Sequence, residues 1–134
     1  MGLENFAPLI GRWALSGEAQ GVIAYRWAEG RRFLLQDFDL HIFGRDIRGL
    51  EVIGHLQPLG AEPSPEVWSR AYIFSDGRTL DYVYEMTGND LTIWFRHKGS
   101  DNFMRGLFDP QAGRFESGWQ WPGGGYRLVG TRLE

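Results

Sequence analysis

Residues 67–96 read VWSRAYIFSDGRTLDYVYEMTGNDLTIWFR, and this stretch decides the fold class. It contains three short runs in which bulky apolar and polar side chains alternate. The connecting segments, SDGR and TGND, place Gly and Asn where tight hairpin turns need them. Period-two alternation interrupted by such turns is typical of antiparallel strands that follow one another in sequence order.

The same rhythm extends from Trp13 to Leu133, and residues 2–10 favour a short helical plug that carries Phe6, Leu9 and Ile10. We predict an all-β, up-and-down antiparallel β-barrel of about ten strands in a single domain, residues 1–134. A β-sandwich built from the same strands is the alternative. The expected strands are Trp13–Ala19, Val22–Trp27, Phe33–Ile42, Ile47–Leu56, Val67–Phe74, Leu80–Met86, Leu91–Arg96, Asn102–Phe108, Arg114–Trp121 and Tyr126–Leu133.

Composition excludes several functional classes. The formal net charge is −3, and Lys98 is the one lysine, so the clustered basic residues of a nucleic-acid-binding surface are missing. There is no cysteine, which excludes disulfides, thiolate metal sites and a cysteine nucleophile. The chain opens on Met1 without a charged and apolar leader, and no apolar run approaches the roughly 18 residues of a membrane-spanning helix. We therefore expect a cytoplasmic protein with no membrane insertion and no nucleic-acid partner.

The segment Leu9-Ile10-Gly11-Arg12-Trp13 resembles the Gly-x-Trp signature that opens the first strand of calycins, the superfamily of lipocalins and fatty-acid-binding proteins. The resemblance implies a barrel whose Trp13 closes one end beneath an arginine of the last strand, either Arg127 or Arg132. EGRRFLLQ (29–36) and FSDG (74–77) are similar to a bacterial lipocalin-like family of unknown function. That likeness implies no activity.

Two calycin relatives can be compared with the residues directly. Fatty-acid-binding proteins carry a helical lid between the first two strands, where this chain offers only Gln20 and Gly21. Nitrobindin-like haem barrels have a further glycine where this chain has Leu15, and a histidine near the C-terminus, whereas the last histidine here is His97. We expect neither that lid nor haem, and no other cofactor.

Alternation sorts each strand into two faces but leaves open which face points into the barrel. Several faces are rich in aromatic residues, in keeping with an aromatic content of 15%. Turned inward, they would bind a flat or polyene-like molecule that carries a carboxylate or carbonyl. The alternative is a filled interior or an exposed dimer face. The predicted ligand-binding residues are Trp68, Arg70, Tyr72, Tyr82, Tyr84, Trp94, Met104 and Trp119.

Two arginines lie in mid-strand among apolar neighbours. If buried, Arg70 and Arg105 each need an anionic partner, and Arg70 with a neighbouring tyrosine would then clamp a ligand carboxylate. The alternative is an outward arginine paired with Asp81 or Glu85 across the strands, which is favoured for Arg105.

Acid–base and metal chemistry have less support. Asp37, Asp39 and His41 share a strand face suited to catalysis or metal binding, but the opposite face is more apolar, so we expect these three in solvent and no metal site. Glu51 and His55 share a face of the next strand. His55 would line the barrel mouth if the proline-rich loop 57–66 forms a flap there.

The sequence predicts a protein that binds a hydrophobic or aromatic small molecule inside the barrel. One alternative is an enzyme of cyclase or isomerase type that uses the same cavity, with Tyr84, Glu85 or His55 handling protons. Another is a homodimeric interaction module with a filled barrel, joined through Trp94 and its strand face.

Overall fold

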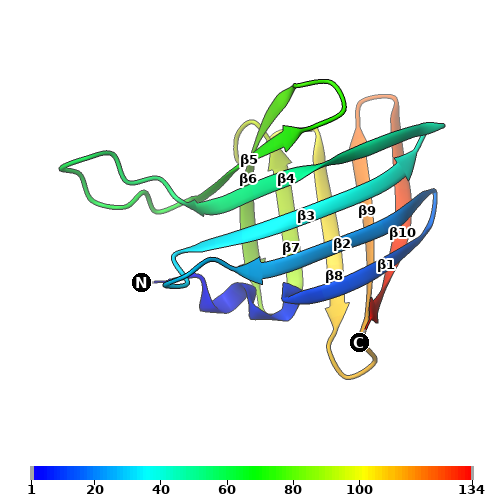
Figure 1. Cartoon of the computed structure of the whole chain (residues 1–134), viewed down its shortest axis with the longest axis horizontal. Coiled ribbons are helices and arrows are strands. Elements are labelled where there is room, and N and C mark those ends of the chain that lie inside the picture. The colour runs from blue at the N-terminus through cyan, green and yellow to red at the C-terminus, as the bar shows by residue number, and fades with distance from the viewer. Residues whose placement is uncertain (1, 134) are drawn as a thin grey trace.

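The computed structural model describes residues 2–133 and shows a closed barrel of ten antiparallel strands in sequence order (Figure 1). The predicted fold class is confirmed, and the sandwich alternative is wrong because β1 and β10 pair along six residues and close the sheet. The elements are η1 (Glu4–Leu9), β1 (Gly11–Gly17), β2 (Ala19–Trp27), β3 (Phe33–Ile42), β4 (Arg45–His55), β5 (Val67–Ile73), β6 (Thr79–Thr87), β7 (Asp90–Phe95), β8 (Phe103–Asp109), β9 (Arg114–Trp121) and β10 (Gly124–Leu133).

The first hairpin turns two residues earlier than expected. Ala19 begins β2 instead of ending β1, so the turn lies at Glu18, and Gln20 belongs to a strand. Gly21, which the sequence analysis placed in this turn, lies inside β2 with a φ of +128°. A side chain there would collide with the carbonyl oxygen of Asp39, so this glycine marks a close approach of β2 to β3.

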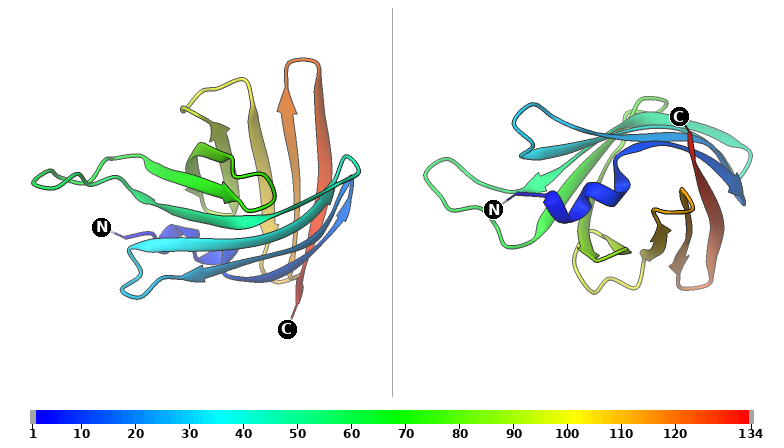
Figure 2. Two further views of the ribbon diagram at one scale, coloured as in Figure 1. Left: turned by 45° about the horizontal axis from the view of Figure 1, so that its top comes forward. Right: turned by 90° about the horizontal axis from the view of Figure 1, so that it is seen from below.

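The N-terminal segment closes one end of the barrel, as predicted (Figure 2). Trp13 is fully buried there and donates a hydrogen bond from Nε1 to the carbonyl oxygen of Leu9 (2.9 Å). The guanidinium of Arg132 lies 4.3 Å from the centre of the Trp13 ring and donates to the carbonyl oxygen of Ile10 (2.6 Å). Arg132 rather than Arg127 is therefore the last-strand arginine that covers this tryptophan.

The proline-rich loop 56–66 is not at the open mouth, which corrects the expectation of a flap there. It joins the end of β4 to the start of β5 at the closed end, on the side of the N-terminal segment, and extends away from the barrel (Figure 1). His55 is at the base of this loop, where its Nδ1 lies 2.7 Å from the carbonyl oxygen of Ser64. Within residues 2–133, no helix is long and apolar enough to cross a membrane.

Replacing Trp13 tests how much this closed end contributes. Trp13→Ala should lower the free energy of unfolding by about 3–5 kcal/mol because it empties a fully buried site. Trp13→Phe should lower the free energy of unfolding by less, because the phenyl ring keeps edge contacts with Phe108 and Phe115. It removes mainly the hydrogen bond to Leu9. Urea unfolding measures both. Equal losses for the two variants, or a loss from Trp13→Ala below about 1 kcal/mol, would contradict this role.

Candidate functional site

The barrel encloses a cavity of about 490 Å³, a volume typical of small-molecule sites. Inward-facing side chains of all ten strands contribute to its wall. The wall is mostly apolar and aromatic, and η1 packs beneath the floor, where the Phe6 ring lies edge-on against Tyr84 (6.3 Å between centroids). The mouth lies at the other end, between the β3–β4, β5–β6 and β9–β10 connections.

Four of the predicted ligand-binding residues line this cavity. They are Tyr82 and Tyr84 on β6, Met104 on β8 and Trp119 on β9. Tyr82 and Trp119 contact one another with their ring centroids 5.7 Å apart. The structure thus brings these residues together on one wall, and their contact with a ligand stays a prediction.

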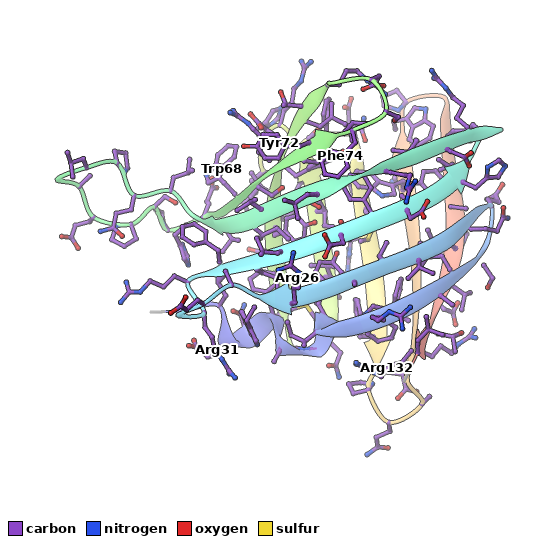
Figure 3. The ribbon with its side chains drawn as sticks, in the orientation of Figure 1. Arg26, Arg31, Trp68, Tyr72, Phe74 and Arg132 are labelled. Atoms are coloured by element: carbon purple, nitrogen blue, oxygen red, sulfur yellow. The ribbon has the colours of Figure 1, made fainter. Side chains whose placement is uncertain are left out.

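Trp68, Arg70 and Tyr72 lie on the face of β5 that points away from the cavity. This corrects the prediction that they line it. Tyr72 is 43% exposed, and Figure 3 labels Trp68 and Tyr72 along this strand. The inward positions of β5 carry smaller side chains, those of Val67, Ser69, Ala71 and Ile73. Aromatic bulk alone was a misleading guide to the inner face of this strand.

Both mid-strand arginines form surface ion pairs. Arg70 makes a two-pronged contact with Asp81 (2.7 and 3.0 Å), so it does not form the predicted clamp for a ligand carboxylate. Arg105 points outward, as favoured, but its partner is Asp90 (3.0 Å). These exposed pairs contribute little to stability, and neither arginine faces the cavity.

Trp94 also lies outside the barrel, which corrects its assignment to the inner wall. Its ring faces Lys98, whose Nζ lies 5.8 Å from the ring centre, and it borders a shallow polar groove on the outer surface of β6–β8. Glu85, named as a proton-handling residue, lies in the same groove and pairs with Lys98 (2.9 Å). Neither side chain can act on a molecule in the cavity.

The acidic face of β3 points to solvent, as expected. Asp37 pairs with Arg26 (3.0 Å), and His41 with Asp46 (2.9 Å). Asp39 lies 3.6 Å from Arg48. In the described part of the chain, no group of three or more histidine or acidic side chains is arranged to hold a metal ion.

The buried carboxyl of the cavity, Glu51 on β4, was not among the residues predicted from the sequence to bind a ligand. This side chain is only 5% exposed and lines the cavity. Its Oε2 accepts a hydrogen bond from the Ser69 hydroxyl (2.6 Å), and its Oε1 accepts one from the Tyr84 hydroxyl (2.8 Å). Glu51 lies two residues from Ile53 and therefore on the same strand face, which was the one sequence signal that it could point inward. The other face of β4 is also apolar, so the sequence did not decide which face is inside.

Burial governs the protonation of this group. Removal from water raises the pKa of Glu51 to about 7, against the lowering effect of the bonds from Ser69 and Tyr84. Burial, followed by the charge of Glu51, raises the pKa of both Tyr25 and Tyr84 far above neutrality. The cavity therefore holds one carboxyl that titrates near neutral pH among tyrosines that stay uncharged.

An aromatic cluster stands at the mouth. Phe43, at the β3–β4 turn, is 67% exposed. Its ring makes edge-on contacts with Trp121 and Tyr126 at the β9–β10 hairpin, with centroid distances of 6.4 and 5.6 Å. Its φ of +54° is one that side chains other than Asn and Asp rarely adopt. A phenylalanine held in this conformation lines the cavity at its rim and joins two hairpins there.

No protein-family model matches the chain, and no curated protein is significantly similar to it.

The protonation of Glu51 predicts a pH dependence of stability that Glu51→Gln removes. Because the folded-state pKa is raised to about 7 from 4.5, the contribution of this group is fully present below about pH 4.5 and lost as the pH rises through about 7. The free energy of unfolding of the wild type, relative to Glu51→Gln, should fall by roughly 3 kcal/mol between these limits. Urea unfolding of both proteins at several pH values measures this difference. A difference that is flat with pH would show that Glu51 is not buried as described.

Proposed function

We propose that the chain binds a hydrophobic or aromatic small molecule inside the barrel and is a calycin-type binding protein of the cytoplasm. The observation that carries the proposal is the cavity of about 490 Å³ with a mostly apolar and aromatic wall and one buried carboxyl. The Gly-x-Trp start of β1 and the stacking of Arg132 on Trp13 support the calycin assignment.

An enzyme that uses the same cavity is the second candidate. It is favoured by the direct hydrogen bond between Tyr84 and Glu51, since a carboxyl that titrates near neutrality can give or take a proton from a bound molecule. His55 and Glu85, considered for this role, lie elsewhere. Turnover of a bound compound that Glu51→Gln abolishes, with binding retained, would separate catalysis from simple binding.

The interaction-module alternative, a homodimer through Trp94, assumes a filled barrel. The interior cavity argues against a filled barrel. A contact between two copies through the outer groove beside Trp94 is still a proposal. Native mass spectrometry reports the oligomeric state and any bound molecule in one measurement.

Native mass spectrometry of freshly purified protein, followed by denaturation, tests binding. We expect an adduct that leaves on denaturation and gives the mass of the ligand. Trp119→Ala should weaken its binding by about tenfold or more, because this ring forms part of the cavity wall. Trp94→Ala is the matched control and should bind as the wild type does, since its ring is outside.

When no adduct is present, titration with the neutral dye Nile red provides the same comparison. Failure of both measurements to detect binding, or equal effects of the two tryptophan variants, would overturn the proposal.

The residue at the rim should control the rate of exchange. Phe43→Asn removes the ring that contacts Trp121 and Tyr126 while placing a residue that tolerates positive φ before Gly44. We expect faster binding and release of Nile red in stopped-flow measurements, with the free energy of unfolding changed by less than about 1 kcal/mol. Unchanged rates would mean that Phe43 does not narrow the entrance.

A further inference from the structure

The carboxyl of Glu51 has hydrogen-bond donors on both oxygens but no positive charge beside it. Ser69 and Tyr84 each donate one hydrogen bond to it, which favours the ionised form. A carboxylate has about four acceptor positions, so both oxygens retain capacity for a ligand. None of the ion pairs within residues 2–133 includes Glu51.

The groups that surround Glu51 from neighbouring strands are polar and neutral. The tyrosines among them have a pKa raised by burial and by the Glu51 charge, so they carry no charge of their own near neutrality. An ionised carboxylate buried among neutral groups is costly unless a cation joins it. The facing groups are Tyr25 on β2, Gln36 on β3, Ser69 on β5, and Tyr82 and Tyr84 on β6.

The rest of the wall is mostly apolar and fits the apolar part of a cationic molecule. Arg78 is the one basic residue on the described cavity wall, and its guanidinium pairs with Asp76 (2.8 Å). The tilted ring pair of Tyr82 and Trp119 supplies aromatic faces, which attract cations as well as apolar groups. An anionic ligand would instead meet the Glu51 carboxylate.

We propose that the cavity selects a protonated primary or secondary amine joined to an apolar or aromatic body, with its ammonium group against Glu51. The inference rests on the proposed function and names its ligand class. It replaces the ligand predicted from the sequence, a molecule that carries a carboxylate or carbonyl. The ammonium group would use the free acceptor positions of Glu51 and balance its charge, while the body fills the aromatic part of the cavity.

Three probes with the same ring system test this selection. They are 2-naphthylmethylamine, 2-naphthylmethanol and 2-naphthoate, which are cationic, neutral and anionic, and titration calorimetry at about pH 8 measures their binding. The amine should bind at least about tenfold more tightly than the alcohol, and the naphthoate should bind most weakly. The affinity for the amine should fall as the pH is lowered through the titration of Glu51, because the amine stays protonated while its partner becomes neutral. The affinity for the alcohol should not change.

Glu51→Gln keeps the shape of the side chain and removes its charge. In this variant the affinity for the amine should fall to that for the alcohol, with no pH dependence left. Ser69→Ala is the matched control, because it removes a donor to Glu51 but not the charge, and it should keep the preference for the amine. If Glu51→Gln does not fold, the ranking of the three probes by the wild type and its pH dependence still decide the question.

The outcomes separate this inference from the proposed function. Equal affinity for the amine and the alcohol, or a preference for the naphthoate, would overturn the amine selection and leave the binding function in place. Absence of binding by all three probes, together with no adduct and no Nile red binding, would overturn both.

Discussion

The contact between Trp13 and Arg132 is the constraint on which the rest of the barrel depends, because it joins the first strand, the last strand and the N-terminal segment. The indole bonds to Leu9, and the guanidinium that covers it bonds to Ile10. Gly11 makes this approach possible, since a side chain at that position would collide with the guanidinium of Arg132. The Gly-x-Trp pattern thus has a physical reason in this chain: the glycine leaves room for the arginine, and the tryptophan supplies the surface on which it lies.

Closing this end determines where a ligand can enter. Phe6 of η1 packs against Tyr84 within the hydrophobic core, so this end of the cavity is closed by side chains. The rim residues Phe43, Arg78 and Trp121 line the cavity at the opposite end. The same packing holds Tyr84 where its hydroxyl meets Glu51. The segment that stabilises the barrel therefore also positions the polar group of the site. A loss of the N-terminal segment would affect both.

The order of the strands followed from the sequence because tight turns and period-two alternation are local signals. The inward face of a strand depends on the space inside the closed barrel, which no local pattern reports. β3 was assigned correctly because its two faces differ sharply, with Phe38 on one and Asp37 on the other. β5 was assigned wrongly because its larger side chains, such as Trp68, lie outside and the small Ser69 lies inside. Glu51 was missed for a related reason: a carboxyl on an apolar strand usually points to water, and only the closed barrel shows that this one does not.

The two ends of the cavity show different compromises between stability and function. At the floor, Glu51 is held by two hydroxyl donors in a site where its charge opposes folding as the pH rises. At the rim, Phe43 occupies a backbone conformation that a glycine or asparagine would adopt with less strain. Neither feature is needed to close the sheet, because the pairing of β1 with β10 and the packing around Trp13 close it. Both unfavourable features lie along the path from the mouth to the floor, where a bound molecule would contact them. Their placement supports the proposed binding function, because a barrel that only had to fold would avoid both.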